Sequence, residues 1–317
     1  QLYVACDGPR SLNNQEERKI KETRFMVESN IDWPCQIRHL YATENHGCRL
    51  GVSRAINWFF EHVEEGIILE DDCIPHPDFF PYCTELLERY RRDTRVWSIC
   101  GSSFQKNHRR GTASYYFSIH GDSWGWATWK RAWKHYGQGQ EYWFDFRDAG
   151  RLSDVFHSHH EQRYWHSILD QLFIDQHPSA WDYQWWLAGW MNNALHIWPN
   201  VCLISNIGFT AEGSNTFGDD PFAALPLEPL GELTHPHFLV ADREADAFAF
   251  QYRRGGKRLI DAGIWDRCIL WVRAIRQVGL VNFISRRLCH HGRRLLQKIF
   301  PSRAFSSRRH ASLQSRR

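Results

Sequence analysis

Short strand-like runs alternate with longer amphipathic stretches over the first ninety or so residues. The pattern predicts strands at 2–6, 35–41 and 67–69, each followed by turn-forming or polar residues. Between them, residues 16–29 form a charged helix, and residues 52–63 carry one apolar stripe at helical spacing. Short strands separated by helices of ten or more residues predict right-handed βαβ units and an α/β fold with a mostly parallel sheet flanked by helices.

Two prolines follow the third strand and bend the chain before another helix. Asp78 is the predicted N-cap of this helix, and Pro81 falls in its first turn, where a missing N–H costs little. The apolar residues that follow are spaced as on one face of a helix: Phe79, Cys83, Leu86, Leu87 and Tyr90.

Three consecutive acids, Glu70, Asp71 and Asp72, directly follow the apolar run 67–69. Ligands of parallel sheets gather at the carboxyl ends of the strands, and carboxylates crowded there repel one another unless a cation lies between them. Mg²⁺ and Mn²⁺ prefer oxygen ligands and often share them with substrate phosphates. The run therefore indicates a nucleotide diphosphate held through a metal, or, in the simpler interpretation, a solvated strand exit that caps the next turn.

Tryptophan is abundant, with 16 residues, and two groups of four are prominent. In the first group Trp126, Trp129 and Trp133 have helical spacing, which predicts core packing. Trp124 and Gly125, just before them, are expected to face a site, because an indole stacks on a sugar ring and a glycine lets a ligand approach. The second group is Trp181, Trp185, Trp186 and Trp190.

Asp182 lies between large aromatic residues at the start of an apolar run. Aromatic neighbours can desolvate a carboxylate and raise its pKa toward neutral pH, as a general base requires. The same position also fits a helix N-cap.

The number of cysteines and the distribution of charge limit the class of protein. The nine cysteines are odd in number and form no C-x-x-C pair, which fits a reducing, cytoplasmic location better than a disulfide framework. Residues 253–317 contain 17 Lys and Arg against two acids, whereas the whole chain of 317 residues has a net charge of +3. Within them, 269–288 fits a basic interfacial helix, which predicts peripheral contact with the inner face of a membrane. A solvated tail is the alternative; no nucleic-acid-binding motif accompanies the charge.

Several segments resemble one enzyme family. Residues 65–90, EGIILEDDCIPHPDFFPYCTELLERY, are similar to the donor-site strand, metal motif and following helix of N-acetylglucosaminyltransferase I and its bacterial relatives. LYVACDGPR, GVSRAINWFFEHV, SWGWATWKRAW, WDYQWWLAGW and NVCLISNIGF also resemble the bacterial relatives, in the expected order over about residues 2–209. The resemblance implies a nucleotide-diphospho-sugar transferase of the GT-A fold, with UDP as the expected nucleotide.

The resemblance also implies roles for the acids. Asp72, the last acid, would be the protein ligand of Mn²⁺ or Mg²⁺, and Asp71 would face the ribose or the metal's water shell. Glu70 would support the metal site or contact the sugar. Asp182 would be the catalytic base of an inverting displacement.

Asp7 and Arg49 complete the expected donor contacts. Asp7 matches an acid placed against the uracil in the family, although capping its own turn is the simpler interpretation. Arg49 would neutralise the diphosphate or remain a solvated loop arginine. The acceptor pocket would include Trp124, Gly125 and Trp181.

The predicted organisation has three parts. Residues 1–104 form the donor half, 105–242 the acceptor and catalytic half, which is helical or mixed, and 243–317 the basic helical tail. In the family the strand at 2–6 is the second one, so we expect a sheet that lacks its first strand and exposes unpaired backbone groups.

The expected activity is metal-dependent transfer of a hexosyl or N-acetylhexosaminyl group to the hydroxyl of a glycan or envelope acceptor. Two alternatives come from other classes of protein. A metal-dependent phosphohydrolase would usually need a second metal site, for which no second acid cluster is present. A noncatalytic nucleotide-sugar binding module would tolerate replacement of Asp182.

Overall fold

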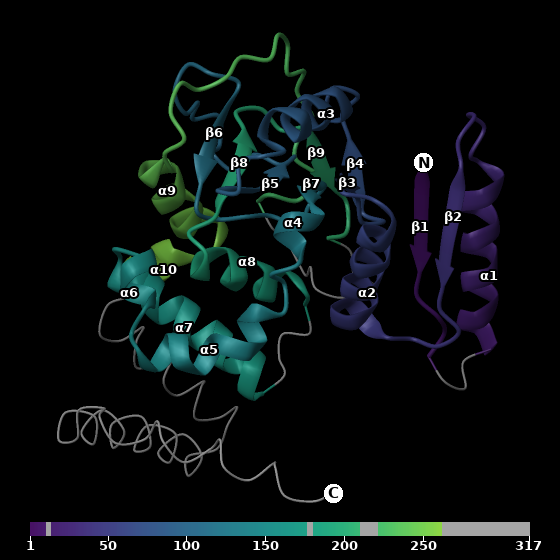
Figure 1. The fold of residues 1–317 in the computed structure, drawn as a ribbon, viewed down its shortest axis with the longest axis horizontal. Coiled ribbons are helices and arrows are strands. Elements are labelled where there is room, and N and C mark those ends of the chain that lie inside the picture. The colour runs from purple at the N-terminus through teal and green to yellow at the C-terminus, as the bar shows by residue number, and fades with distance from the viewer. Residues whose placement is uncertain (11–13, 176–179, 210–220, 262–317) are drawn as a thin grey trace, which may run out of the picture. The chain divides into compact units, whose positions relative to one another are not determined.

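The computed structural model describes residues 1–10, 14–175, 180–209 and 221–261 (Figure 1). Contacts divide the chain into two units, 1–257 and 258–317. In the second unit only 258–261 are described, and they end helix α10 (Gly256–Asp261). The predicted interfacial helix at 269–288 lies outside the described residues. None of the described helices is long and apolar enough to cross a membrane.

The first unit begins with a two-stranded parallel sheet. Strands β1 (Leu2–Cys6) and β2 (Ile37–Tyr41) are joined by helix α1 (Asn14–Ser29), which confirms the predicted βαβ unit. Helix α2 (Gly47–His62) follows and leads into β3 (Glu65–Ile68). The ring of Tyr3 on β1 packs edge-on against Phe59 of α2, with ring centroids 5.0 Å apart.

The larger sheet has five strands in the order β3-β7-β5-β8-β6. Its other strands are β5 (Val96–Cys100), β6 (Tyr115–Ser118), β7 (Trp126–Trp129) and β8 (Leu195–Pro199). Only β5 and β8 are parallel neighbours, because β7 lies antiparallel between β3 and β5, and β6 is antiparallel to β8. The fold is mixed α/β, as predicted, but this sheet is mixed rather than mostly parallel.

A third, two-stranded sheet brings a distant segment beside the acidic run. It pairs β4 (Cys73–Pro75) with β9 (Ile204–Asn206). Helix α3 (Phe79–Tyr90) follows β4 and buries the predicted apolar face. Asp78 precedes α3 as predicted, but its carboxylate makes no capping bond and instead accepts a hydrogen bond from the Leu230 backbone N–H.

The remaining helices are α4 (Lys130–Trp133), α5 (Gln138–Asp148), α6 (Leu152–Val155), α7 (His159–Ile174), α8 (Asp182–Met191) and α9 (Arg243–Arg253). Of these, α5, α7 and α8 pack together (Figure 1). Their tryptophans fill much of one core cluster.

Trp126, Trp129 and Trp133 are buried, which confirms the predicted packing, but the helical spacing was the wrong reason. Trp126 and Trp129 lie on strand β7, which has neighbours on both sides. Residues three apart on a strand point to opposite faces. Trp126 therefore packs with the tryptophans of α8, while Trp129 packs with the cluster under α3.

Among the described residues, β1 pairs only with β2, and β3 pairs only with β7. Each strand therefore keeps one edge without a partner strand. Residues of both strands line one large cavity.

Candidate functional site

A cavity of about 2270 Å³ brings together the acids predicted from three parts of the sequence. It is lined by β1 and β3, by the start of α8 and by the end of α9. Asp7, Trp124, Trp181 and Asp182 line it, together with the whole acidic run 70–72. Arg49 and Gly125 are not among its lining residues.

The acidic run lies in the turn between β3 and β4. Burial and, to a smaller extent, the nearby carboxylates of Asp182 and Asp72 together raise the pKa of Glu70 to about 8. The indole N–H of Trp181 donates to Glu70 Oε1 over 3.2 Å. This bond lowers the pKa of Glu70, but by less than burial raises it. With this pKa Glu70 is mostly protonated at neutral pH, and a cation bound among these acids would favour its charged form.

Asp72 lies against Gly208 of the β9 segment. The Ile207 backbone N–H donates to the Asp72 carbonyl oxygen over 2.9 Å, which fixes the two segments together. A Cβ atom added to Gly208 would lie 2.3 Å from Asp72 Oδ2, so only glycine leaves the approach to this oxygen free of a side chain.

The residues present fit a hard divalent ion if the protein supplies only some of its ligands. Asp72 would hold the ion, and the crowded carboxylates supply the oxygen chemistry that Mn²⁺ and Mg²⁺ prefer. Among the described residues, no group of three or more His, Cys, Asp or Glu is placed to bind a metal. Substrate phosphates would therefore have to complete the coordination, and Asp71 is exposed to solvent beside it.

Asp182 is the first residue of α8. Its Oδ2 accepts a 3.4 Å hydrogen bond from the Ser123 hydroxyl, while its buried Oδ1 has no hydrogen-bond partner among the described residues. Burial raises the pKa of Asp182 to about 6; Arg254 opposes this rise and Asp122 adds to it. The N-cap position belongs to Trp181, so the interpretation of Asp182 as the N-cap was wrong. A carboxyl with this pKa changes charge close to neutral pH.

Trp181 is a structural link between the two acids. It is 2% exposed, and its ring stacks on Trp126 with centroids 5.6 Å apart. Because its N–H points at Glu70, it ties the start of α8 to the end of β3. Its predicted contact with an acceptor stays a prediction.

Trp124 and Gly125 differ in their surroundings. Trp124 lines the cavity and packs edge-on against Phe209, with ring centroids 5.4 Å apart. Gly125 has φ +57°, and a Cβ there would lie 2.4 Å from a methyl carbon of Ile204. The glycine is therefore required by the backbone and by packing, and its predicted contact with an acceptor stays a prediction.

The two remaining donor residues lie near α2. Asp7 accepts backbone N–H bonds of 2.9 to 3.0 Å from Gly8, His46 and Gly47, so its carboxylate holds its own turn and the start of α2. This agrees with the capping alternative, and a uracil contact stays a prediction. Arg49 lies on α2 near Tyr136, and its diphosphate contact likewise stays a prediction.

Sequence reasoning missed Asp122, Arg253 and Arg254. Asp122 is 3% exposed, and burial raises its pKa, while the two arginines lower it. Arg253 and Arg254 line the cavity, although the charge pattern had placed them at the start of a basic tail. The available signal was the amphipathic run at 243–253, which predicts a packed helix leading into the two arginines.

Comparison with known proteins adds no identification: no family model and no curated protein matches this sequence.

Proposed function

We propose that the protein is a metal-dependent glycosyltransferase with a GT-A-type fold. It transfers a sugar from a nucleoside diphosphate, with UDP as the expected nucleotide, to the hydroxyl of an acceptor. The observation that carries the proposal is the meeting of Glu70, Asp72 and Asp182 at one cavity. Asp182 Oδ1, which is buried and has no hydrogen-bond partner in the described part of the chain, lies there beside the acidic turn that follows β3.

Each acid has a different role in the proposed reaction. Asp182 accepts the proton of the acceptor hydroxyl as its oxygen attacks the anomeric carbon. The bond between that carbon and the diphosphate oxygen breaks, and the nucleoside diphosphate leaves with the electron pair. Attack from the face opposite the leaving group inverts the anomeric centre. Ser123, which donates to Asp182 Oδ2, orients the carboxylate with Oδ1 available for the proton.

Asp72 would hold the divalent ion, which, when bound, neutralises negative charge on the diphosphate. Gly208 supports this role because it leaves Asp72 Oδ2 unobstructed. Since the protein offers few ligands of its own, we expect the ion to bind weakly without nucleotide and tightly with it.

The test is sugar release and transfer from a panel of nucleotide sugars, with and without Mn²⁺. The variants are Asp72→Asn and Asp182→Asn, and the matched control is Asp154→Asn, whose side chain is in an exposed ion pair with Arg151. We expect Mn²⁺-dependent turnover that both site variants lose and the control keeps.

The same experiment separates the two alternatives. Binding of a nucleotide sugar without turnover, unchanged by Asp182→Asn, would indicate a noncatalytic binding module. Release of phosphate from the nucleotide, with no sugar released or transferred, would indicate a phosphohydrolase. Either result would refute the transferase proposal.

A further inference from the structure

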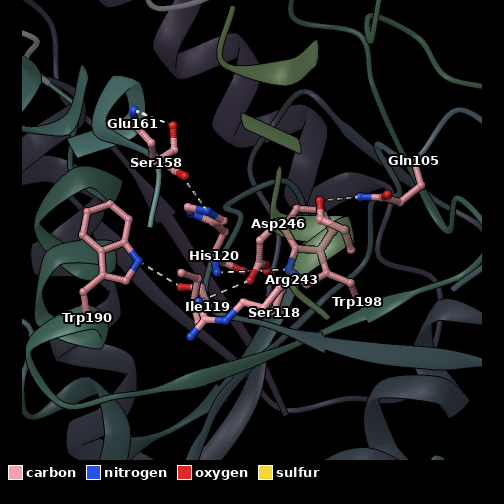
Figure 2. A network of polar contacts seen from close by, with 11 residues as sticks. Gln105, Ser118, Ile119, His120, Ser158, Glu161, Trp190, Trp198, Arg243 and Asp246 are labelled. Carbon is pink, nitrogen blue, oxygen red and sulfur yellow. Dashed lines mark hydrogen bonds and ion pairs between the residues drawn. The ribbon is translucent and has the colours of Figure 1, made fainter. Parts of the chain in front are cut away.

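Helix α9 is fixed to the central sheet by a buried polar network (Figure 2). Asp246 on α9 accepts a 2.5 Å hydrogen bond from the Ser118 hydroxyl at the end of β6. The same hydroxyl oxygen accepts the backbone N–H of His120, whose imidazole lies 3.1 Å from Glu161 on α7. Gln105 donates to the carbonyl of Ala245, also on α9, over 3.2 Å. The first turn of α9 is therefore held in a defined position.

The opposite, C-terminal end of the same helix places two guanidinium groups at the cavity. Arg253, the last residue of α9, lies 4.3 Å from the ring centroid of Trp124 and 4.8 Å from that of Phe104. Arg254 lies 4.2 Å from the ring centroid of Trp186. Contact with the face of an aromatic ring holds a guanidinium in place, while its N–H groups lie in the guanidinium plane and point to its edges.

Arg254 has the hydrogen-bonding capacity that a ligand needs. Within the described part of the chain its guanidinium makes no hydrogen bond and no ion pair within 4 Å. Other arginines at the cavity have protein partners: Arg91 pairs with Glu65, Arg10 with Glu16, and Arg24 donates to two backbone carbonyls. A half-buried guanidinium with five N–H donors is well suited to an oxyanion.

Arg254 lies on the Asp182 side of the cavity. Its guanidinium is 4.2 Å from the ring centroid of Trp186, which is one helical turn after Asp182 on α8. Its charge acts on Asp182 and, together with Arg253, on Asp122. If Asp182 takes the proton of the acceptor hydroxyl, a group bound by Arg254 belongs to the acceptor and not to the diphosphate.

We propose that Arg253 and Arg254 bind an oxyanion, a carboxylate or a phosphate, that the acceptor carries near its reacting hydroxyl. The acceptor is thus an acidic sugar or a sugar phosphate. The planar guanidinium of Arg254 makes paired hydrogen bonds to two of its oxygens, and Arg253 adds charge from the Trp124 side. This inference rests on the proposed function for the identity of the acceptor side.

The experiment compares glucuronic acid, glucose 6-phosphate and glucose as ligands of the full chain, with UDP and Mn²⁺ present. Binding is measured by ligand-observed NMR for the wild type, Arg254→Gln, Arg254→Lys and Lys257→Gln. Lys257→Gln removes an exposed charge three residues away and is the matched control. Circular dichroism checks that each variant is folded.

We expect the wild type and Lys257→Gln to bind at least one of the two anionic sugars roughly tenfold more tightly than glucose, about the value of one charged hydrogen-bonded contact. Arg254→Gln should lose this preference, and Arg254→Lys should keep only part of it, because lysine has charge but no fork. The ratio of the two anions identifies carboxylate or phosphate as the recognised group.

Three results would overturn the inference: equal binding of all three ligands, no detectable binding of either anion, or a preference that survives in Arg254→Gln. Loss of UDP affinity in Arg254→Gln with the anion preference intact would assign the arginines to the diphosphate instead. UDP affinity that changes neither with Mn²⁺ nor with Asp72→Asn would refute the proposed function. Even then, an anion preference that Arg254→Gln removes would support an oxyanion site at Arg254.

Discussion

Gly208 lies so close to Asp72 that any side chain there would contact the carboxylate. A Cβ would come within 2.3 Å of Oδ2, which is shorter than any van der Waals contact. We therefore predict that Gly208→Ala weakens Mn²⁺-dependent UDP binding by roughly tenfold or more, because Asp72 must turn away from its ligand position. Isothermal titration with and without Mn²⁺ measures this.

Gly137→Ala is the matched control, because a Cβ there meets no atom within 4 Å. It should leave UDP affinity unchanged. Equal affinity in Gly208→Ala and in the wild type would show that Asp72 does not hold the metal.

Asp182 gives a second prediction, for the pH dependence of transfer. Its pKa is about 6 and the base must be deprotonated, so kcat should rise with pH through about 6 and level off above it. Asp182→Asn should lower kcat by roughly a hundredfold or more and remove this limb.

Ser123→Ala tests the same assignment more gently. The Ser123 hydroxyl donates to Asp182 Oδ2, which favours the charged carboxylate. Its removal should move the limb to higher pH, without the large loss in kcat of Asp182→Asn. A profile that keeps its limb in Asp182→Asn would assign the ionisation to another group.

At the residue scale, the sequence placed the acids correctly at a strand end, and composition around Asp182 correctly suggested a desolvated carboxyl. It could not show that Trp181 points its N–H at Glu70, because that contact joins residues 111 positions apart. Nor could it distinguish Asp182 as N-cap from Asp182 as first helical residue, since the two differ by one position in where the helical backbone begins.

Helix α9 is the element on which the two cavity arginines depend. Phe250 is 3% exposed and packs against Tyr164 of α7, with ring centroids 5.7 Å apart. We predict that Phe250→Ala destabilises this packing by about 3 kcal/mol and speeds amide hydrogen exchange along α9.

The half-buried Phe248 on the same helix offers a matched substitution. Phe248→Ala should cost less and leave exchange in α9 closer to that of the wild type. If both variants exchange alike, α9 is not held through Phe250, and the position of the arginines depends on the polar network alone.

At the element scale, helices and strands with clear periodicity were predictable, including β1, β2, α2 and the apolar face of α3. Strand β7 was not, because tryptophans spaced by three and four imitate a helix when both faces of a strand are buried. The antiparallel position of β7 was also beyond local pattern, since pairing with β3 and β5 is decided by contacts distant in sequence.

For the whole molecule, the order of the strands and the meeting of three distant segments at one cavity required the structure. The division into a donor half and an acceptor half stays a prediction, whereas the structure shows a cavity lined by residues of β1, β3 and α8. The two arginines escaped notice because net charge described 253–317 as a single region, although the first compact unit extends to Lys257.

The stability of the folded chain should depend on acid through a buried histidine. His196 on β8 is fully buried, its Nδ1 shares a 2.6 Å hydrogen bond with Ser98, and burial lowers its pKa to about 3. The unfolded chain binds this proton below about pH 6.5, whereas the folded chain does not. The contribution of neutral His196 to the stability of the fold is therefore fully present above pH 6.5 and is lost as pH falls toward 3.

We predict that His196→Asn, which removes the titrating group, flattens the fall in unfolding free energy between pH 6.5 and 4 by up to about 1.4 kcal/mol per pH unit. Urea unfolding at several pH values measures the slope. Glu70 and Asp182 contribute to this slope with the opposite sign, because the fold raises their pKa values. The quantity to compare is therefore the difference in slope between the variant and the wild type. The exposed His62 serves as control: His62→Asn should leave the slope unchanged, and parallel slopes in all three proteins would show that His196 is protonated in the fold.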